Sequence, residues 1–309
     1  MKKFDLKEII NNNHLSIARG ITFVEHDNEL TKDDQEKIWT LSRKAIKIGI
    51  TGPPGAGKST LVNNLINFYL KAGNSVGVVA VDPSSPFTGG ALLGDRVRMS
   101  KYIGNKNVYI RSLGNKGSLG GLSSVAHDAG NIIAASGKDI IIYETVGVGQ
   151  AEHDIIEESD ITVVILVPES GDEVQLMKAG LIEIADLFVI NKSDRPGANR
   201  LEHSLRNILH TFTKKDQLEP NVYKTVSTKG EGLKGLFDGI NTLINKLKSS
   251  NSFNDKRLNQ YRTRVSKIIT NDINKKFWTN SKKEKLLKNT NDIHSLDNSP
   301  HSFSKILLE

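Results

Sequence analysis

The sequence predicts an α/β fold in which a mainly parallel sheet is flanked by helices. Three observations support this: short, β-branched apolar segments recur between residues 44 and 247, helical patterns separate most of them, and polar residues follow directly where several of them end. Near-continuous apolar segments are typical of strands that are buried on both faces. The intervening helices imply right-handed crossovers between parallel strands.

Seven segments are predicted as strands: Ile46–Thr51, Val76–Asp82, Val108–Arg111, Asp139–Glu144, Ile161–Val167, Asp186–Asn191 and Val222–Val226. Nearly every residue with useful chemistry falls just after the end of one of them. Open α/β sheets bind ligands at the carboxyl ends of their strands. We therefore expect the functional site at that edge of the sheet.

Helical extensions are expected on both sides of a central domain that spans residues 45–248. Residues 1–44 predict two short helices, one carrying Leu6, Ile9 and Ile10, the other beginning at Thr31, where Asp34 approximates a capping box. The run Lys248–Ser252 has the composition of a linker. It opens a C-terminal extension, residues 249–309, whose last part, residues 289–309, we expect to be loosely ordered because it is rich in Asn and Ser.

An amphipathic helix of about five turns is predicted in the C-terminal extension. Its apolar residues follow a helical period: Leu258, Tyr261, Val265, Ile268, Ile269, Ile273 and Phe277. Such a stripe must pack on the main domain or on a second subunit. We expect a homodimer in which this extension serves as the dimerisation arm.

Composition and charge narrow the class of protein. The 309 residues contain no cysteine, which excludes disulfides, a cysteine nucleophile and thiolate zinc sites. The longest apolar run, Ile161–Val167, is far shorter than the roughly 20 residues of a membrane span. The first residues lack the apolar stretch of a secretory signal, so we expect a cytoplasmic protein.

The net charge of +7 is concentrated near the C-terminus. Between residues 249 and 289 there are eleven Lys and Arg against three Asp and Glu, an excess of +8, so the rest of the chain is close to neutral. A basic helical tail can contact RNA, acidic lipid or an acidic partner, and it can equally be a solvated face. Because the excess is confined to the tail, we do not expect nucleic acid to be the partner.

A phosphate-binding loop follows the first strand. Gly52-Pro53-Pro54-Gly55-Ala56-Gly57-Lys58-Ser59 matches the P-loop pattern G-x-x-x-x-G-K-[ST] between an apolar strand and an amphipathic helix. The glycines allow backbone N–H groups to surround phosphate oxygens at the start of the helix. Gly55, Ala56, Gly57, Lys58, Ser59 and Thr60 are the predicted contacts. Lys58 is expected on the β- and γ-phosphates as a catalytic charge, and the Ser59 hydroxyl on Mg²⁺.

A guanine-reading turn follows the sixth strand. In Asn191-Lys192-Ser193-Asp194 the carboxylate of Asp194 can accept from both the ring N–H and the exocyclic amine of guanine, and adenine has no such pair of donors. Asn191 is expected to brace the loop, and the stem of Lys192 to lie over the base. Ser227 and Thr228 follow the seventh strand and fit a loop that closes on the guanine oxygen. The predicted ligands are thus GTP and GDP.

Acidic residues are available for a magnesium centre. Asp82 and Glu144 end strands, and Asp95 lies in Gly94-Asp95-Arg96. Magnesium prefers hard oxygen ligands and keeps several waters. We predict Ser59, Asp82, Asp95 and Glu144 as metal ligands, with Asp95 and Glu144 also catalytic. Gly147, three residues after Glu144, is placed to sense the γ-phosphate.

A cation that neutralises transition-state charge is harder to assign from the sequence. Four basic residues lie near the predicted switch segments: Arg96, Arg98, Arg111 and Lys116.

The ordered set of motifs resembles one known family. The segments that carry the resemblance are Asp82–Pro86, Thr88–Gly90, Leu93–Asp95, Gly117–Gly121, Glu144–Gln150 and Asn191–Asp194. They resemble the methylmalonyl-CoA mutase-associated GTPases, also called the MeaB or ArgK family, over about residues 46–247. Asn115-Lys116 departs from the Ser-Arg pair usual there, and the C-terminal region is short and rich in Asn and Lys.

The resemblance implies a homodimeric GTPase with helical extensions. Because the nucleotide motifs contain no secure arginine finger or water-positioning glutamine, we expect Mg²⁺-dependent hydrolysis that is slow without a partner. The resemblance further implies a chaperone that gates adenosylcobalamin loading, or protects the loaded enzyme, in a cobalamin-dependent acyl-CoA mutase such as methylmalonyl-CoA mutase. The loop after the fifth strand, Pro168–Lys178, is implied to be an additional switch that signals to the mutase.

Three alternatives stay open at this stage. A GTPase metallochaperone would normally carry Cys or His relay motifs, and this chain has no cysteine and no H-x-H or H-x-x-H cluster. A nucleotide-regulated scaffold would bind GTP without hydrolysing it, and a transport-associated kinase would transfer the γ-phosphate to protein.

Overall fold

The computed structural model describes residues 4–26, 28–82, 100–102, 104–114, 121–145, 159–169, 181–212, 219–291, 296 and 298–308. The chain divides into two compact units, Met1–Lys256 and Arg257–Glu309. None of the helices in the described ranges is both long enough and apolar enough to cross a bilayer.

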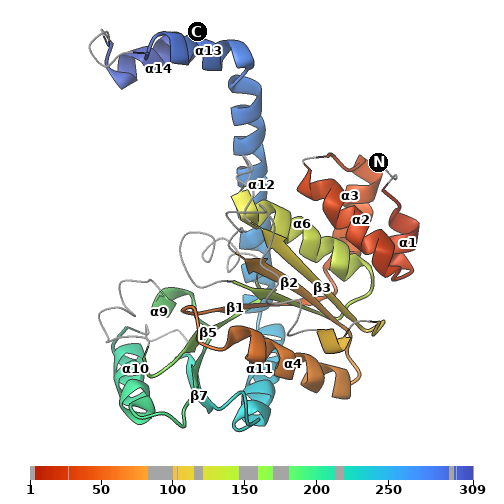
Figure 1. Ribbon diagram of the computed structural model, residues 1–309, viewed down its shortest axis with the longest axis vertical. Coiled ribbons are helices and arrows are strands. Elements are labelled where there is room, and N and C mark those ends of the chain that lie inside the picture. Colours follow the sequence, from red (N-terminus) through yellow and green to blue (C-terminus); the bar gives the residue numbers. More distant parts are fainter. Residues whose placement is uncertain are drawn as a thin grey trace. The chain divides into compact units, whose positions relative to one another are not determined.

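One seven-stranded sheet forms the centre of the first unit (Figure 1). The strands pair in the order β3-β2-β4-β1-β5-β6-β7, and every pairing is parallel. Their bounds are β1 Ile46–Thr51, β2 Val76–Asp82, β3 Val108–Gly114, β4 Ile140–Glu144, β5 Ile161–Leu166, β6 Leu187–Asn191 and β7 Asn221–Thr225. All seven predicted strands are confirmed, and β3 continues three residues beyond the predicted end.

The strand order creates a crevice at β1. From β1 the chain crosses to β2, on the far side of β4, and later returns to place β5 on the other side of β1. The carboxyl ends of β1 and of its neighbours β4 and β5 therefore border the point where the winding reverses, which is where doubly wound sheets bind ligands.

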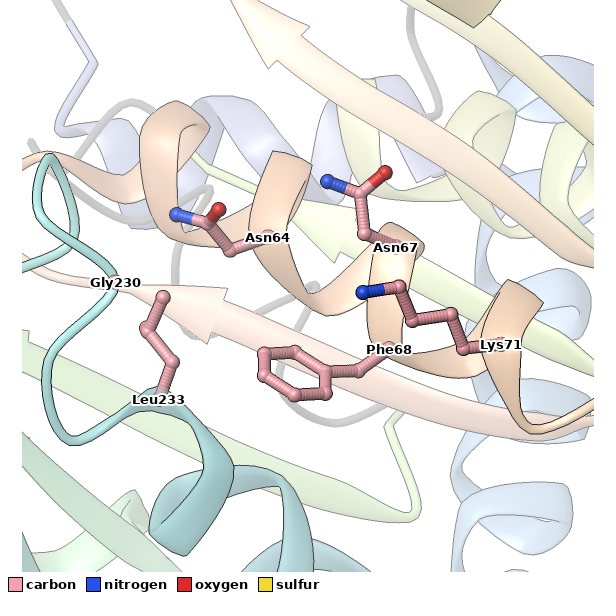
Figure 2. A pocket seen from close by; sticks show the side chains of 6 residues that line it. All are labelled: Asn64, Asn67, Phe68, Lys71, Gly230 and Leu233. Carbon is pink, nitrogen blue, oxygen red and sulfur yellow. The ribbon is translucent and has the colours of Figure 1, made fainter.

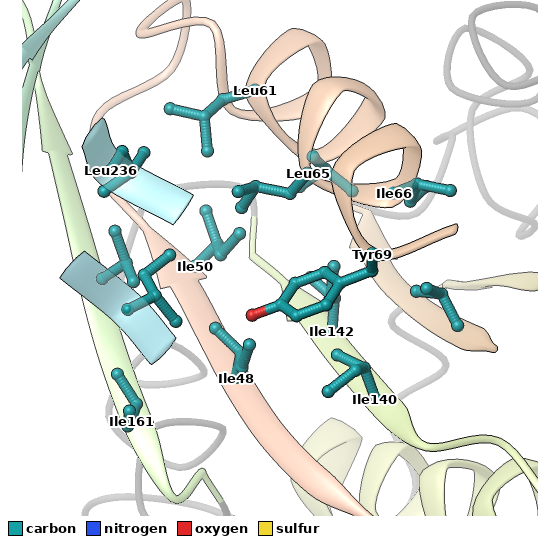
Figure 3. Close-up of a cluster of buried hydrophobic side chains, with 14 of the residues drawn as sticks. Ile48, Ile50, Leu61, Leu65, Ile66, Tyr69, Ile140, Ile142, Ile161 and Leu236 are labelled. Atoms are coloured by element: carbon teal, nitrogen blue, oxygen red, sulfur yellow. The ribbon is translucent and has the colours of Figure 1, made fainter. Parts of the chain in front are cut away.

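Helices cover both faces of the sheet. On one face α4 (Lys58–Lys71) and α11 (Leu233–Ser249) pack on alternate residues of the strands, including Ile48, Ile50 and Ile142 (Figure 3). The intervening strand residues point to the other face, since side chains alternate along a strand. There α6 (Gly121–Ala135) packs on β2 and β4, and α10 (Ala198–Phe212) packs on β5 and β6. The described part also contains η1 (Ser100–Tyr102) and α9 (Leu181–Ile184).

The N-terminal extension contains three helices, so the expectation of two is wrong. They are α1 (Leu6–Ile10), α2 (His14–Glu25) and α3 (Lys32–Ser42), and they pack with α6. The predicted start of α3 at Thr31 is confirmed: the Thr31 hydroxyl accepts from the N–H of Asp34 and donates to the Asp34 carboxylate, which approximates a capping box. The sequence pattern did not predict α2, because its buried side chains are only Ile17 and Ile21, with Gly20 between them. Asn13 caps its first turn.

Three helices are described in the C-terminal region, the last of which ends at Leu308. The predicted amphipathic helix is α12 (Ser252–Phe277), and α13 (Asn280–Lys288) and α14 (Pro300–Leu308) follow. The expectation of loose order over residues 289–309 is therefore wrong for α14. Proline at its first position favours the start of α14. Its Leu307 side chain is buried, and near its end Lys285 donates to the carbonyl oxygen of Ile306.

Candidate functional site

The phosphate-binding loop connects β1 to α4 at the crevice. Its conformation requires glycine at two positions. Gly52 has φ +140°, and a Cβ there would lie 2.0 Å from the carbonyl oxygen of Ile165 on β5. Gly57 has φ +89°, and its Cβ would lie 2.4 Å from the side-chain nitrogen of Asn191. The loop is thus packed closely against both β5 and the end of β6.

Lys58, the first residue of α4, folds back across this loop. Its Nζ atom donates to the carbonyl oxygens of Gly52 (2.7 Å) and Pro53 (3.0 Å), and the residue is buried. The ammonium group is therefore held inside the loop, where phosphate oxygens would meet the backbone N–H groups and the start of α4. Of the other predicted contacts, Ala56 is buried, Thr60 is half-buried in the first turn of α4, and Gly55 is exposed.

Ser59 and Glu144 meet although 85 residues separate them. The Ser59 hydroxyl donates to Oε1 of Glu144 at 2.6 Å, and both residues are buried. β4 lies beside β1, so the residue that ends β4 is brought to the first turn of α4. A second bond in the same place joins the hydroxyls of Thr145 and Thr51 at 2.9 Å.

These two oxygens fit a magnesium ion. A serine hydroxyl and a carboxylate beside a phosphate loop are the kind of hard oxygen ligands that Mg²⁺ takes in nucleotide sites. Asp82 is the last residue of β2, which is the other neighbour of β4. The side chain of Asp82, and Asp95 and Gly147 entirely, lie outside the described residues. Within the described ranges no three or more His, Asp and Glu side chains gather as metal ligands would.

Asn191 connects the phosphate loop to the guanine-reading turn. Its side-chain nitrogen donates to the carbonyl oxygen of Ala56 at 2.8 Å. Its side-chain oxygen accepts from the hydroxyl of Thr225 (3.1 Å) and from the N–H (3.1 Å) and hydroxyl (2.9 Å) of Ser227. Only 2% of Asn191 is exposed. One buried amide therefore holds together the P-loop, the end of β6 and the loop after β7.

The turn itself presents Asp194 to solvent. Lys192 adopts a left-handed φ of 54°, and the N–H of Ser193 donates to the carbonyl oxygen of Thr225 at 3.1 Å. The side chain of Asp194 is 40% exposed and forms an ion pair of 3.1 Å with Lys229. The hydrogen bond from Lys229 lowers the pKa of Asp194, which keeps the carboxylate ionised as a hydrogen-bond acceptor.

The loop after β7 is also anchored to α4. Asn64 donates from its side chain to the carbonyl oxygens of Thr60 (3.0 Å) and Ser227 (2.9 Å). Behind this contact lies a cavity of about 190 Å³ (Figure 2). Its walls are Asn64, Asn67, Phe68, Lys71, Gly230 and Leu233. It is smaller than most small-molecule sites, at about 300–1,000 Å³, so we do not assign the nucleotide to it.

Several contacts of the site were not predicted from the sequence. The bond from Asn64 to Ser227 and the ion pair between Lys229 and Asp194 join segments that only the tertiary fold brings together. Thr228, which was predicted, is exposed next to Lys229. Arg111, one of the four candidate cations, pairs instead with Glu25 of α2. Arg96, Arg98 and Lys116 lie outside the described residues.

Comparisons with known proteins find relatives that match over most of the chain. A protein of Pyrococcus abyssi whose name includes the word GTPase is 42% identical over 295 residues, which cover 94% of this chain and 91% of that protein. The mouse methylmalonic aciduria type A homolog is 33% identical over 281 residues, covering 85% and 68%. Among solved structures, a crystal structure of a LAO/AO transport system kinase has a TM-score of 0.71 at 23% identity, covering 98% and 95%, and shares the fold.

A family model matches most of the chain. It spans residues 17–282, and so includes the P-loop, the end of β4 and the guanine-reading turn. The chain therefore belongs to the methylmalonyl-CoA mutase-associated GTPase MeaB family.

Proposed function

We propose that this protein binds and hydrolyses GTP with Mg²⁺ and acts as a nucleotide-gated chaperone of an adenosylcobalamin-dependent acyl-CoA mutase. The observation that carries the nucleotide part is the Asn191 amide, which joins the phosphate loop at Ala56 to the base-reading side of the site at Ser227. The family name and the relation to a methylmalonic aciduria protein support the mutase part.

Base recognition is assigned to Asp194. Its ionised carboxylate accepts from the ring N–H and the amine of guanine, and it exchanges the ion pair with Lys229 for these two bonds when the base enters. The loop that contains Ser227 and Thr228 is assigned to close on the guanine oxygen, while the Ser227 N–H stays bonded to Asn191. The stem of Lys192, whose backbone is left-handed, is assigned to the face of the base.

Phosphate chemistry is assigned to the opposite end of the site. Lys58 exchanges its carbonyl partners for the β- and γ-phosphate oxygens, and the backbone N–H groups of Gly55 to Thr60 bind the remaining ones. Ser59 and Glu144, with Asp82 and Asp95, would hold Mg²⁺, which would supply neutralisation of phosphate charge. In the hydrolysis itself water attacks the γ-phosphate, the bond to GDP breaks and inorganic phosphate leaves.

The wild-type protein tests the guanine assignment directly. Labelled GDP should be displaced by GTP and not by ATP. Asp194→Asn should lose affinity for GDP by about 10- to 100-fold, the range expected when a hydrogen bond to a charged group is lost. The same variant should gain affinity for xanthine nucleotides, whose base presents an acceptor where guanine has its amine.

Lys229→Met is the matched control, because it removes the ion pair of Asp194 and leaves the carboxylate. It should keep the preference for guanine over adenine and xanthine. Equal displacement of GDP by ATP from the wild type would show that Asp194 does not read the base. A Lys229→Met protein that prefers xanthine would assign the selectivity to the ion pair instead.

A further inference from the structure

The segment that follows β5 contacts the guanine-reading turn. Val167 lies just beyond the strand, and Glu169 forms an ion pair with Arg195, the residue directly after Asp194. The same two segments also lie close together at Pro168, whose Cβ is 3.7 Å from where a Cβ on Gly197 would stand. The turn is thus held from the β5 side as well as from the β7 side.

The charges at this contact favour an ionised Glu169 paired with Arg195. The hydrogen bond from Arg195 lowers the pKa of Glu169, and the positive charge of Lys192 lowers it further. The Glu169 carboxylate is therefore stabilised by Arg195, with which it pairs, and by the charge of Lys192, the first residue of the turn Lys192–Asp194. It stays ionised at neutral pH, so both attractions persist under physiological conditions.

We infer that Glu169 is a positioning residue for guanine recognition: through Arg195 it holds the turn that carries Asp194, and so slows the release of bound nucleotide. The inference rests on the guanine site proposed above. The physical reason is preorganisation. A turn that is already held in its binding conformation loses less conformational entropy when the base binds.

The exposure of the Glu169–Arg195 pair limits how much it can slow the release of nucleotide. The side chains of Glu169 and Arg195 are 52% and 50% exposed, and exposed ion pairs contribute little free energy because water screens them. We therefore expect the GDP dissociation rate to rise by about two- to fivefold when the pair is broken. The difference should shrink in 0.5 M KCl, where exposed charges attract each other only over short distances.

The test measures dissociation of fluorescent GDP and GTP from full-length wild type, Glu169→Gln, Arg195→Gln and the double variant. Each single variant should release both nucleotides faster by a similar factor, since the base is the same. The double variant should match the singles rather than multiply them, because one interaction is lost in each case. KM for GTP should rise more than kcat falls.

Asp238→Asn is the matched control. Asp238 pairs with Lys234 on α11, and its side chain is 53% exposed, close to the value for Glu169. It should leave both dissociation rates at the wild-type value. Wild-type dissociation from Glu169→Gln, or effects that multiply in the double variant, would overturn the inference. Failure of the wild type to bind GDP at all would instead contradict the guanine site itself.

Discussion

The side chain of Glu144 combines burial and negative charge at the end of a strand. A buried carboxylate is costly unless it is paired or coordinates a metal. Here it accepts a hydrogen bond from Ser59, the residue that a P-loop uses for magnesium. Its burial is therefore consistent with a site that is completed by a cation.

Removing this charge should impair metal-dependent turnover more than nucleotide affinity. We expect Glu144→Ala to lower GTP turnover by about tenfold or more at limiting Mg²⁺, with a smaller change in GDP affinity, because GDP keeps the P-loop and guanine contacts. Asp95→Ala should behave in the same way. Turnover against Mg²⁺ concentration is the measurement.

Glu144→Gln controls for packing, since it keeps the shape and an acceptor for Ser59 while removing the charge. It should share the metal defect of Glu144→Ala and melt close to the wild-type temperature. Turnover at the wild-type level in both Glu144→Ala and Asp95→Ala at limiting Mg²⁺ would show that the metal centre lies elsewhere.

At the scale of single elements, α12 has a buried first turn and an exposed apolar stripe beyond it. Its first turn belongs to the first unit, because Phe253 is buried in the core under α4 and α11 and Lys256 donates to the carbonyl oxygen of Asp160 (2.8 Å) and to the carboxylate of Asp186 (3.0 Å). Beyond it, large apolar side chains are exposed. They are Leu258, Tyr261, Val265, Ile268, Ile269 and Ile273.

This exposed stripe should form the interface of a homodimer. A patch of large apolar side chains of this length on one helix face typically marks an interaction surface. We expect the full chain to have the mass of a dimer in light scattering and the chain cut after Lys256 to have the mass of a monomer. The cut is placed there because ending earlier would remove Phe253 and Lys256 from the first unit.

Point variants test the same interface in the full chain. Ile269→Glu places a charge in the stripe and should shift the dimer toward monomer. Thr270→Glu is the matched control, because successive residues are 100° apart around a helix and Thr270 is exposed outside the stripe. An unchanged dimer mass after the cut, or equal effects of the two variants, would place the interface on another surface.

At the scale of the whole molecule, the site is assembled where the strand order reverses. No residue has been assigned as the cation that neutralises charge in the transition state of GTP hydrolysis. Of the four candidate cations only Arg111 lies in the described ranges, and it pairs with Glu25 on the face covered by the N-terminal helices. We propose that a group supplied or ordered by the client enzyme completes the site. In other GTPases such a group raises the rate by about 10³–10⁵.

Turnover by this protein alone should accordingly be slow, and a cobalamin-dependent acyl-CoA mutase should accelerate it. The proposed contact is the loop after β5, where Asp172, Glu173 and Lys178 are charged. Each change to alanine should reduce the stimulation, measured as GTP turnover with and without the mutase. Heat-inactivated mutase is the control, and full stimulation of all three variants would mean that the signal uses another surface.

By itself, the sequence determined the seven strands, the turn of the P-loop, the amphipathic C-terminal helix and the family, because periodicity and motif spacing are local properties of the chain. It missed α2 and α14, where short helices depend on capping and on packing with neighbours. Only the tertiary structure decided the strand order and the contacts that assemble the site. Asn191 meets Ala56 across 135 residues, Ser59 meets Glu144 across 85, and Arg195 meets Glu169 across 26. The physical reason is that each partner is delivered by a different strand, so its distance from the others depends on which strands are neighbours and not on sequence separation.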